Sequence, residues 1–385
     1  MKNHLGPYEA LVVNGEKVIS YKGNSVFKKI DNVKKTEFNG PILKDRLNDI
    51  VTKKYFYHLH KIDNGIFLAT VEYFKKIKAE WCNLPLTTMM ISSPGEIYAG
   101  KKLDYTTDTL PVKINWFDEE REIFLSESSQ FYLELRLLID NVDKVFSIYN
   151  SFRKEKADYC HLSEFQHVEF EGKIDSKQNI EIATNYLKYI TKYLLKNNKK
   201  DLAFFLNKQE VKELSETFKK GNISEITFQD ALEKLFIDTR DQKYKDFTMK
   251  NFGAWEEIRL TEIMNSHVIV TEFPMLEIPF YHNTHKTNIN GVALAQNADI
   301  ILRGFRETIG SGQRIEDVDI LRHKAEIFNL PKEDYEPYLQ TREFKHYRTT
   351  SGFGMGWQRY VQWLLKIPYI WDSTHIPRGH LLPKP

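Results

Sequence analysis

Hydrophobic and polar residues alternate with a period of two in several parts of the chain. The stretch from Val145 to Glu171 reads as an apolar strand, a polar loop and a second apolar strand, which predicts a long β-hairpin. Short strands with turns at Asn14-Gly15 and Gly23-Asn24 are predicted in the first forty residues, and further strands at His267–Thr271 and Ala293–Leu302. A period of two dominates these segments, so they indicate sheet.

Other segments repeat their apolar residues with the period of a helix. The pattern from Ile66 to Trp81 predicts a helix with one apolar face, made of Phe67, Val71, Phe74 and Ile77. The remaining predicted segments are a strand and a helix in 122–138, helices in the Lys-rich 175–250, a helix at Ile315–Phe328, and a Gly-rich turn at Gly352–Gly356 that opens a helix at Trp357–Leu365. Hairpin strands with a late helix predict an α+β fold with an antiparallel sheet flanked by helices, not a parallel βα array.

Composition restricts the class of protein. A chain of 385 residues with 41% hydrophobic and 13% aromatic residues is long enough to bury a sizeable core. Its formal charge of +2 gives no general case for nucleic-acid binding. Cys82 and Cys160 lie too far apart for a disulfide framework, which favours a reducing compartment. No secretory signal and no run of 18 apolar residues is found, so we expect a cytoplasmic protein without a membrane partner.

The predicted hairpin carries side chains suited to a nucleotide. Arg153 and Glu155 alternate on one strand, and Phe165 and His167 alternate on the other. Such a face offers a guanidinium for a phosphate and a ring for a base to stack on. On these residues alone, an ordinary strand pair with surface charges is the commoner explanation.

Two later segments change that balance. Gly352-Phe-Gly-Met-Gly-Trp-Gln-Arg359 places three alternate glycines before an arginine on a helix, where a flat ligand can approach the backbone and the guanidinium can lie over a purine. The segment from Asp299 to Arg314 holds Asp299 and Glu307 for a hard cation and Arg314 for a carboxylate.

Together these segments resemble the catalytic domain of class II aminoacyl-tRNA synthetases of the asparaginyl/aspartyl branch. FRKE followed by HLSEFQHVEFE resembles the second signature motif, GFGMGWQR the third, and WCNLPLTTMMISSP around Pro85 the first, which in this family builds the homodimer interface. PFYHN at 279–283 and DSTHIPRG at 372–379 also match this branch. The resemblance implies a short N-terminal extension at 1–64 and a catalytic domain at 65–385, with a helical insertion at about 175–250.

The resemblance also implies roles for individual residues, with ATP as a substrate and Mg²⁺ as the cofactor. Arg153 would hold the α-phosphate and the amino-acid carboxylate side, and His161 would reach the γ-phosphate. Phe165 and Arg359 would sandwich the adenine, and Glu155 would lie near the adenine and the acceptor end. The implied groups are catalytic Arg153, Glu155, His161 and Arg359; ATP-binding Arg153, His161, Phe165, Glu307, Gly356 and Arg359; amino-acid-binding Gln130, Glu134, Tyr281 and Arg314; and metal-binding Asp299 and Glu307.

The segment Ser126–Glu134 bears on the amino acid. Aspartyl enzymes carry a lysine where this chain has Leu133, and the asparaginyl pattern carries a glutamate that Glu134 matches. A buried carboxylate opposite Glu134 would be costly, so a neutral amide or an ammonium-bearing substrate is favoured over aspartate, and asparagine fits the pattern better. The alternative is that Glu134 is a surface acid paired with Arg136 or Lys144.

Several positions depart from the family pattern. Glutamate is usual where Gln358 stands, arginine where Cys160 and Trp371 stand, and Arg306 beside Glu307 is a potential competitor for the metal ligand. The roughly hundred-residue OB-fold that binds the anticodon in this branch is not expected, because only about 60 residues precede the first motif.

The sequence therefore predicts an enzyme that forms an aminoacyl-adenylate from asparagine or an aspartate-like substrate. We expect transfer to a non-standard acceptor such as ammonia or a small amine. One alternative is a compact asparaginyl-tRNA synthetase that reads the tRNA acceptor stem. The other is a regulatory paralogue that binds ATP or an amino acid without turnover.

Overall fold

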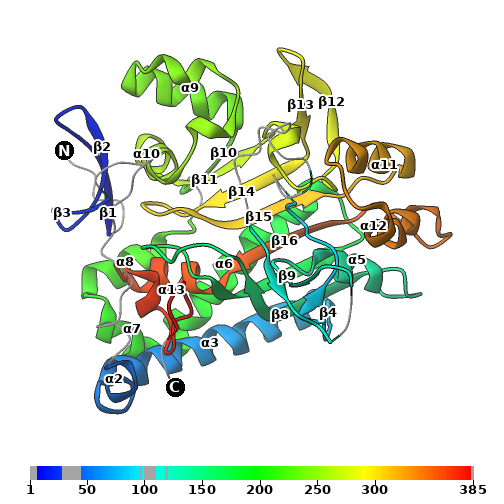
Figure 1. Ribbon diagram of the computed structural model, residues 1–385. Coiled ribbons are helices and arrows are strands. Elements are labelled where there is room, and N and C mark those ends of the chain that lie inside the picture. Colours follow the sequence, from blue (N-terminus) through cyan, green and yellow to red (C-terminus); the bar gives the residue numbers. More distant parts are fainter. Residues whose placement is uncertain are drawn as a thin grey trace.

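The computed structural model describes residues 7–27, 45–94, 98, 110–117, 120–219 and 221–382, and an eight-stranded sheet runs through its centre (Figure 1). In spatial order its strands are β10 (Ile223–Thr227), β11 (His267–Thr271), β14 (Asn297–Ile301), β15 (Glu307–Gln313), β16 (Ser351–Gly356), β9 (Glu164–Gly172), β8 (Lys144–Phe152) and β4 (Glu80–Trp81). The neighbours from β11 to β8 pair antiparallel, and the outer pairs β10–β11 and β4–β8 are parallel. The predicted α+β fold with an antiparallel-rich sheet is confirmed.

The predicted long hairpin is β8 and β9, which pair in register from Lys144↔Gly172 to Phe152↔Glu164. Their alternation divides the side chains between two faces. Val168 and Phe170 enter the main hydrophobic core, whereas His167 and Glu169 point to the opposite face and line a cavity. The hairpin thus joins the core to the candidate site.

Helices cover the core face of the sheet. Helix α6 (Ser176–Asn197) contacts β14, β15 and β16, and α3 (Lys54–Lys76) packs on α6. Phe74 of α3 stacks on Phe146 of β8 with ring centroids 4.4 Å apart. In the described part of the chain, further α-helices are α2 (Arg46–Thr52), α5 (Gln130–Arg136), α7 (Lys199–Phe205), α8 (Lys208–Glu216), α9 (Phe228–Thr239), α10 (Ala254–Met264), α11 (Val318–Ile327), α12 (Lys332–Leu339) and α13 (Trp357–Leu365).

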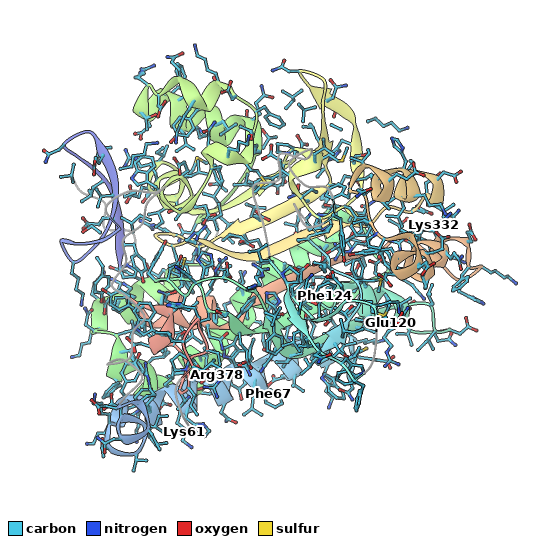
Figure 2. The ribbon with its side chains drawn as sticks, in the orientation of Figure 1. Lys61, Phe67, Glu120, Phe124, Lys332 and Arg378 are labelled. Carbon is cyan, nitrogen blue, oxygen red and sulfur yellow. The ribbon has the colours of Figure 1, made fainter. Side chains whose placement is uncertain are left out.

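The apolar face predicted for the first long helix is partly wrong. Phe74 is buried, but Phe67 and Val71 are 47% and 38% exposed. The buried stripe instead follows Ile62, Ile66, Ala69 and Tyr73. The buried stripe is centred about one residue before the predicted one, which corresponds to a rotation of about 100° around the helix axis. The reason is that α6 covers the side with the buried stripe. Phe67 lies on α3 at the lower rim of the view in Figure 2.

The segment predicted as a glycine-rich turn is the central strand β16. Phe353 and Met355 face the core on α6, and the alternate glycines face the cavity. A Cβ at Gly352 would lie 2.4 Å from the backbone oxygen of Phe170 on the neighbouring strand. Glycine is therefore needed for close packing within the sheet, not for a turn. A second strand that the helical pattern concealed is β10, inside the segment 175–250.

Smaller sheets lie around the central one. They are β1 (Tyr8–Val13), β2 (Glu16–Tyr21) and β3 (Asn24–Phe27); β5 (Thr87–Thr88), β7 (Ile123–Leu125) and β6 (Val112–Ile114); and β12 (Thr284–Ile289) with β13 (Val292–Ala295). The predicted N-terminal strands are confirmed, and Trp255 Nε1 of α10 donates to the carbonyl oxygen of Leu11 at 3.2 Å. The boundary predicted after residue 64 falls inside α3, and the division into domains stays a prediction. Within the described ranges, no helix is both long and apolar enough to span a bilayer.

Candidate active site

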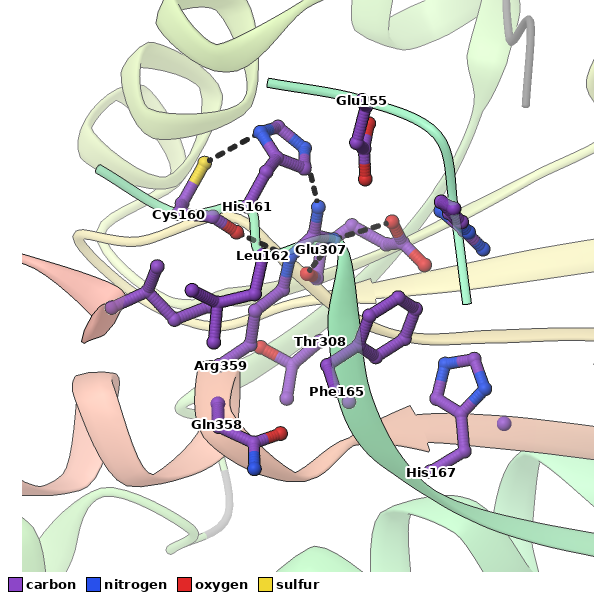
Figure 3. Close-up of a pocket in the computed structure, with 14 residues that line it drawn as sticks. Glu155, Cys160, His161, Leu162, Phe165, His167, Glu307, Thr308, Gln358 and Arg359 are labelled. Carbon is purple, nitrogen blue, oxygen red and sulfur yellow. Dashed lines mark hydrogen bonds and ion pairs between the residues drawn. The ribbon is translucent and has the colours of Figure 1, made fainter. Parts of the chain in front are cut away.

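A cavity of about 490 Å³ lies on the face of the sheet opposite α6. It lies over β9, β14, β15 and β16, and a smaller pocket shares several of its lining residues (Figure 3). Strand alternation explains the lining, because the residues between core positions on these strands face this side. Predicted site residues that line one or both spaces are Gln130, Arg153, Glu155, His161, Phe165, Tyr281, Asp299, Glu307, Arg314, Gly356 and Arg359.

Four side chains from distant parts of the chain meet in the smaller pocket. Arg153 follows β8, Phe165 lies on β9, Glu307 begins β15, and Arg359 lies in the first turn of α13. The Arg153 guanidinium carbon lies 5.3 Å from the centre of the Phe165 ring. A stacking ring, two guanidinium groups and a carboxylate therefore share one space, which suits the base and phosphates of a nucleotide.

Arg359 joins α13 to the start of β15 and to the loop between β8 and β9, where its Nε donates to the backbone oxygen of Cys160 at 3.4 Å. Its Nη1 donates to the backbone oxygen of Glu307 at 3.0 Å and to Glu307 Oε2 at 3.1 Å. Its Nη2 lies 2.8 Å from Nε2 of His161, and Figure 3 shows His161 directly above the guanidinium. The side chain is mostly buried, so its orientation is set by these contacts.

Asp299 and Glu307 converge above Gly310. A Cβ at Gly310 would lie 3.0 Å from Glu307 Oε1 and 3.7 Å from Asp299 Oδ1, so no side chain separates the two carboxylates. Burial and the neighbouring Glu307 and Glu257 raise the pKa of Asp299 well above its usual range. Closely spaced carboxylate oxygens at a buried, acid-rich site fit Mg²⁺, because a cation relieves their repulsion.

A second group of ligand-type side chains lies nearby but does not suit a cation. Asp158, Cys160 and His161 are the one set of three His, Cys, Asp or Glu residues, among those the structure describes, whose ligand atoms lie within 4.8 Å of one another. Arg306 Nη1 is 3.2 Å from the Cys160 sulfur. That guanidinium opposes a positive ion at this position.

The other end of the cavity contains a buried arginine. Arg314 donates to Glu171 from Nε at 3.0 Å and from Nη2 at 2.7 Å, and it also donates to Gln130. Its guanidinium carbon lies 4.9 Å from the centre of the Tyr281 ring. Burial disfavours the charge, but Glu171, Tyr281 and Glu134 together raise the pKa of Arg314 above its ordinary value. Gln130 and Tyr281 are thus brought together with Arg314, as the resemblance implies.

Glu134 lies behind this end of the cavity and is not among its lining residues. Its Oε1 accepts from the Tyr338 hydroxyl at 2.6 Å, and its Oε2 accepts from Arg342 Nη2 at 2.8 Å. Arg314 Nε is 3.9 Å away. The alternative of a surface acid is wrong, because Glu134 is buried. Its predicted contact with a substrate stays a prediction, and both of its oxygens already have partners.

Three buried acids and bases of the site were missed in the sequence. Glu169 accepts from Ser128 and from the backbone of Ser129, and burial raises its pKa. Glu257 of α10 binds Arg306, and Arg342 binds Glu134. Glu169 lies within the second motif and was a visible candidate. Nothing in the local pattern distinguishes Glu257 or Arg342 from surface charges.

These residues lie in a chain whose family is established by comparison. A family model described as tRNA synthetases class II (D, K and N) matches residues 99–380. The chain therefore belongs to the class II tRNA synthetase family, and it is a ligase of that type, as its motifs indicate.

Individual relatives point to one branch of the family. The asparagine–tRNA ligases of Lactobacillus johnsonii and Lactobacillus gasseri are each 28% identical over 380 residues, which is 98% of this chain and 80% of theirs. The asparaginyl-tRNA synthetase of Pyrococcus horikoshii, solved with asparaginyl-adenylate, superposes with a TM-score of 0.77 at 24% identity over 96% of this chain and 84% of that one. That of Entamoeba histolytica gives 0.72 at 17% identity, covering 99% and 83%. These structural likenesses concern the fold.

Proposed function

We propose that this chain activates asparagine with ATP and Mg²⁺ and transfers the asparaginyl group to tRNA. The observation that carries the proposal is the convergence of Arg153, Phe165, Glu307 and Arg359 on one pocket. The cavity continues along β15 to Arg314, just beyond its last residue, Gln313. Seven strand residues span roughly 23 Å, so the nucleotide pocket and the Arg314 end lie at opposite ends of this strand.

The chemistry requires positioning and charge neutralisation more than a protein base. The substrate carboxylate attacks the α-phosphorus, and pyrophosphate leaves with the bonding electron pair. Arg153 supplies positive charge around the phosphates. The contacts of Arg359 with His161 and Glu307 favour the same role for Arg359, in place of the stacking on adenine expected from the sequence. Asp299 and Glu307 would hold Mg²⁺, which neutralises phosphate charge when it is bound. His161 would contact the γ-phosphate, and Glu155 would lie beside the adenine and the acceptor end.

Charge balance at the Arg314 end supports an amide substrate. Arg314 is already paired with Glu171 through two hydrogen bonds, and Glu134 lies 3.9 Å from it. Glu169, which lines the cavity, is a third acid in this region. An aspartate side chain would bring a further negative charge into this region, and Leu133 stands where aspartyl enzymes carry a lysine that could pair with it. The asparagine amide can instead donate a hydrogen bond to an acid.

The acceptor is assigned from the relatives, which are tRNA ligases. Transfer to ammonia or a small amine, the first expectation from the sequence, has no support in these comparisons, and charging of tRNA fits them better. A regulatory paralogue without turnover is disfavoured, because the full set of arginines and acids is present around one cavity.

One experiment separates these functions. The purified protein is assayed for amino-acid-dependent ATP–pyrophosphate exchange with each standard amino acid, and then for acylation with total tRNA or with ammonia as the acceptor. We expect exchange with asparagine and asparaginyl-tRNA as the product, recognised by an ester bond that survives mild acid and is hydrolysed in mild alkali. Exchange followed by amide formation alone would refute tRNA as the acceptor, and absence of exchange with every amino acid would refute the activity.

We further propose that the protein acts as a homodimer through the region around Pro85. Trp81 and Leu86 flank this proline and are 61% and 42% exposed, and Phe67, Leu68 and Val71 leave an apolar strip on α3. Exposed apolar residues of this size are typical of interfaces. Light scattering coupled to gel filtration should give twice the chain mass of 45.5 kDa, and Phe67→Glu with Val71→Glu should give the monomer.

A further inference from the structure

Arg306 is a cavity-lining arginine that the roles above leave unused. Arg306 and its neighbour Glu307 both line the cavity. Adjacent residues of a strand would face opposite sides, but Arg306 lies in the turn that precedes β15 and is not bound by this alternation. Its side chain is only 14% exposed. A buried guanidinium at this place requires partners that fix it.

Glu257 of α10 provides the first of these partners. Arg306 Nε donates to Glu257 Oε2 at 2.9 Å, and Nη2 lies 3.3 Å from Oε1. The same Oε2 accepts the backbone N–H of Glu307 at 3.1 Å. This two-point contact holds the guanidinium in one plane and leaves Nη1 directed away from Glu257.

The Nη1 edge faces the loop between β8 and β9. It lies 3.2 Å from Cys160 Sγ and 3.5 Å from His161 Nε2. Arg359 Nη2 lies 2.8 Å from the same His161 nitrogen. Two guanidinium groups therefore converge on one imidazole nitrogen in a buried space, and an anionic oxygen placed between them would satisfy both.

We propose that Arg306 binds the pyrophosphate portion of ATP together with Arg359 and stabilises it as the leaving group. The inference rests on the proposed function, since that reaction breaks the bond between the α-phosphorus and the bridging oxygen and places the electron pair on pyrophosphate. Position 160, where the resemblance leads one to expect arginine, holds a cysteine whose sulfur lies against Arg306 Nη1. The guanidinium missing at Cys160 is thus supplied from the neighbouring strand turn.

The test compares ligands with and without the pyrophosphate portion. Binding of ATP, inorganic pyrophosphate and AMP is measured by calorimetry for the wild type and Arg306→Met. We expect pyrophosphate and ATP affinity to fall by about 10- to 100-fold, as for loss of charged hydrogen bonds, with AMP affinity within about twofold. Arg303→Met is the matched control, because Arg303 belongs to the same turn, donates to Asn265 and does not line the cavity. Unchanged pyrophosphate affinity in Arg306→Met would overturn the assignment.

A second variant tests the exchange of positions. The double variant Arg306→Gly with Cys160→Arg removes the guanidinium from position 306 and places one on position 160, whose sulfur lies 3.2 Å from Arg306 Nη1 in the wild type. We expect pyrophosphate affinity to return to within about fivefold of wild type. AMP binding reports folding in each variant. A double variant that binds AMP normally but pyrophosphate as weakly as Arg306→Met would contradict the exchange. If the wild-type protein shows no asparagine-dependent exchange, the proposed function is refuted but the assignment of Arg306 is not. Pyrophosphate binding by the wild type and Arg306→Met still tests that assignment.

Discussion

Replacing Glu134 by glutamine distinguishes a substrate contact from a structural one. The Glu134 and Arg342 side chains are 3% and 0% exposed and form an ion pair at 2.8 Å. Burial is the largest effect and by itself lowers the pKa of Arg342, but Glu134, Tyr338 and Tyr347 together raise that pKa above its ordinary value, so the guanidinium stays charged. Glu134→Gln therefore leaves a buried positive charge without its counter-charge, which costs about 3–5 kcal/mol.

Urea denaturation followed by tryptophan fluorescence measures this cost. With a slope of about 3 kcal/mol per molar urea, the midpoint should fall by about 1–1.7 M. Tyr338→Phe is the matched control, because it removes a hydroxyl that donates to Glu134 at 2.6 Å and accepts from Arg342 at 2.8 Å but leaves the ion pair in place. We expect it to lose about half as much, roughly 1.5–2.5 kcal/mol.

The asparagine KM for ATP–pyrophosphate exchange gives the opposing readout. If Glu134 acts through Arg342 and Tyr338, the stability loss dominates and the aspartate-to-asparagine preference changes little. An unchanged urea midpoint in Glu134→Gln, combined with a tenfold or larger rise in asparagine KM (about 1.4 kcal/mol), would refute the structural role and establish the direct contact.

Three further predictions follow from individual contacts. Gly352→Ala should abolish exchange and lower the thermal midpoint, because its Cβ would lie 1.9 Å from Glu171 Oε2 and 2.4 Å from a backbone oxygen; normal activity would contradict the strand packing. Arg359→Ala should abolish exchange while leaving the circular dichroism spectrum intact, and normal exchange would refute its role at the nucleotide. Burial lowers the pKa of Lys324 to about 7, so the folded protein binds this proton less readily than the unfolded chain and loses stability as pH falls from about 10.5 to 7. The difference in unfolding free energy between Lys324→Met and wild type should therefore change by about 1.4 kcal/mol per pH unit in that range. A difference that does not depend on pH would exclude the shift.

Much of the fold was predictable from local pattern. The hairpin of β8 and β9 follows from alternation over the segment Val145–Glu171, and α11 and α13 follow from helical periodicity. Errors arose where a short pattern has two explanations. Alternating glycines at 352–356 satisfy a turn as well as a strand, and only the pairing of β16 between β15 and β9 decides between them.

Some residues of the candidate site could be predicted from the sequence and others could not. Arg153, Phe165, Glu307 and Arg359 were visible as members of ordered motifs, and the structure brings them to one pocket. Glu257 and Arg342 were not visible, because a charged residue on a helix has the same local pattern whether it faces water or a buried partner. The partners of both residues, Arg306 and Glu134, lie 49 and 208 positions away along the chain.

The sequence by itself determined which segments alternate, which repeat helically, and which chemical groups are available at the motifs, since these depend on neighbours within a few residues. Only the tertiary structure decided which face of α3 is buried, that β16 lies in the centre of the sheet, and that Glu134 is enclosed by Tyr338 and Arg342. The physical reason is that burial and charge pairing depend on contacts between segments far apart in sequence, and periodicity carries no information about those contacts.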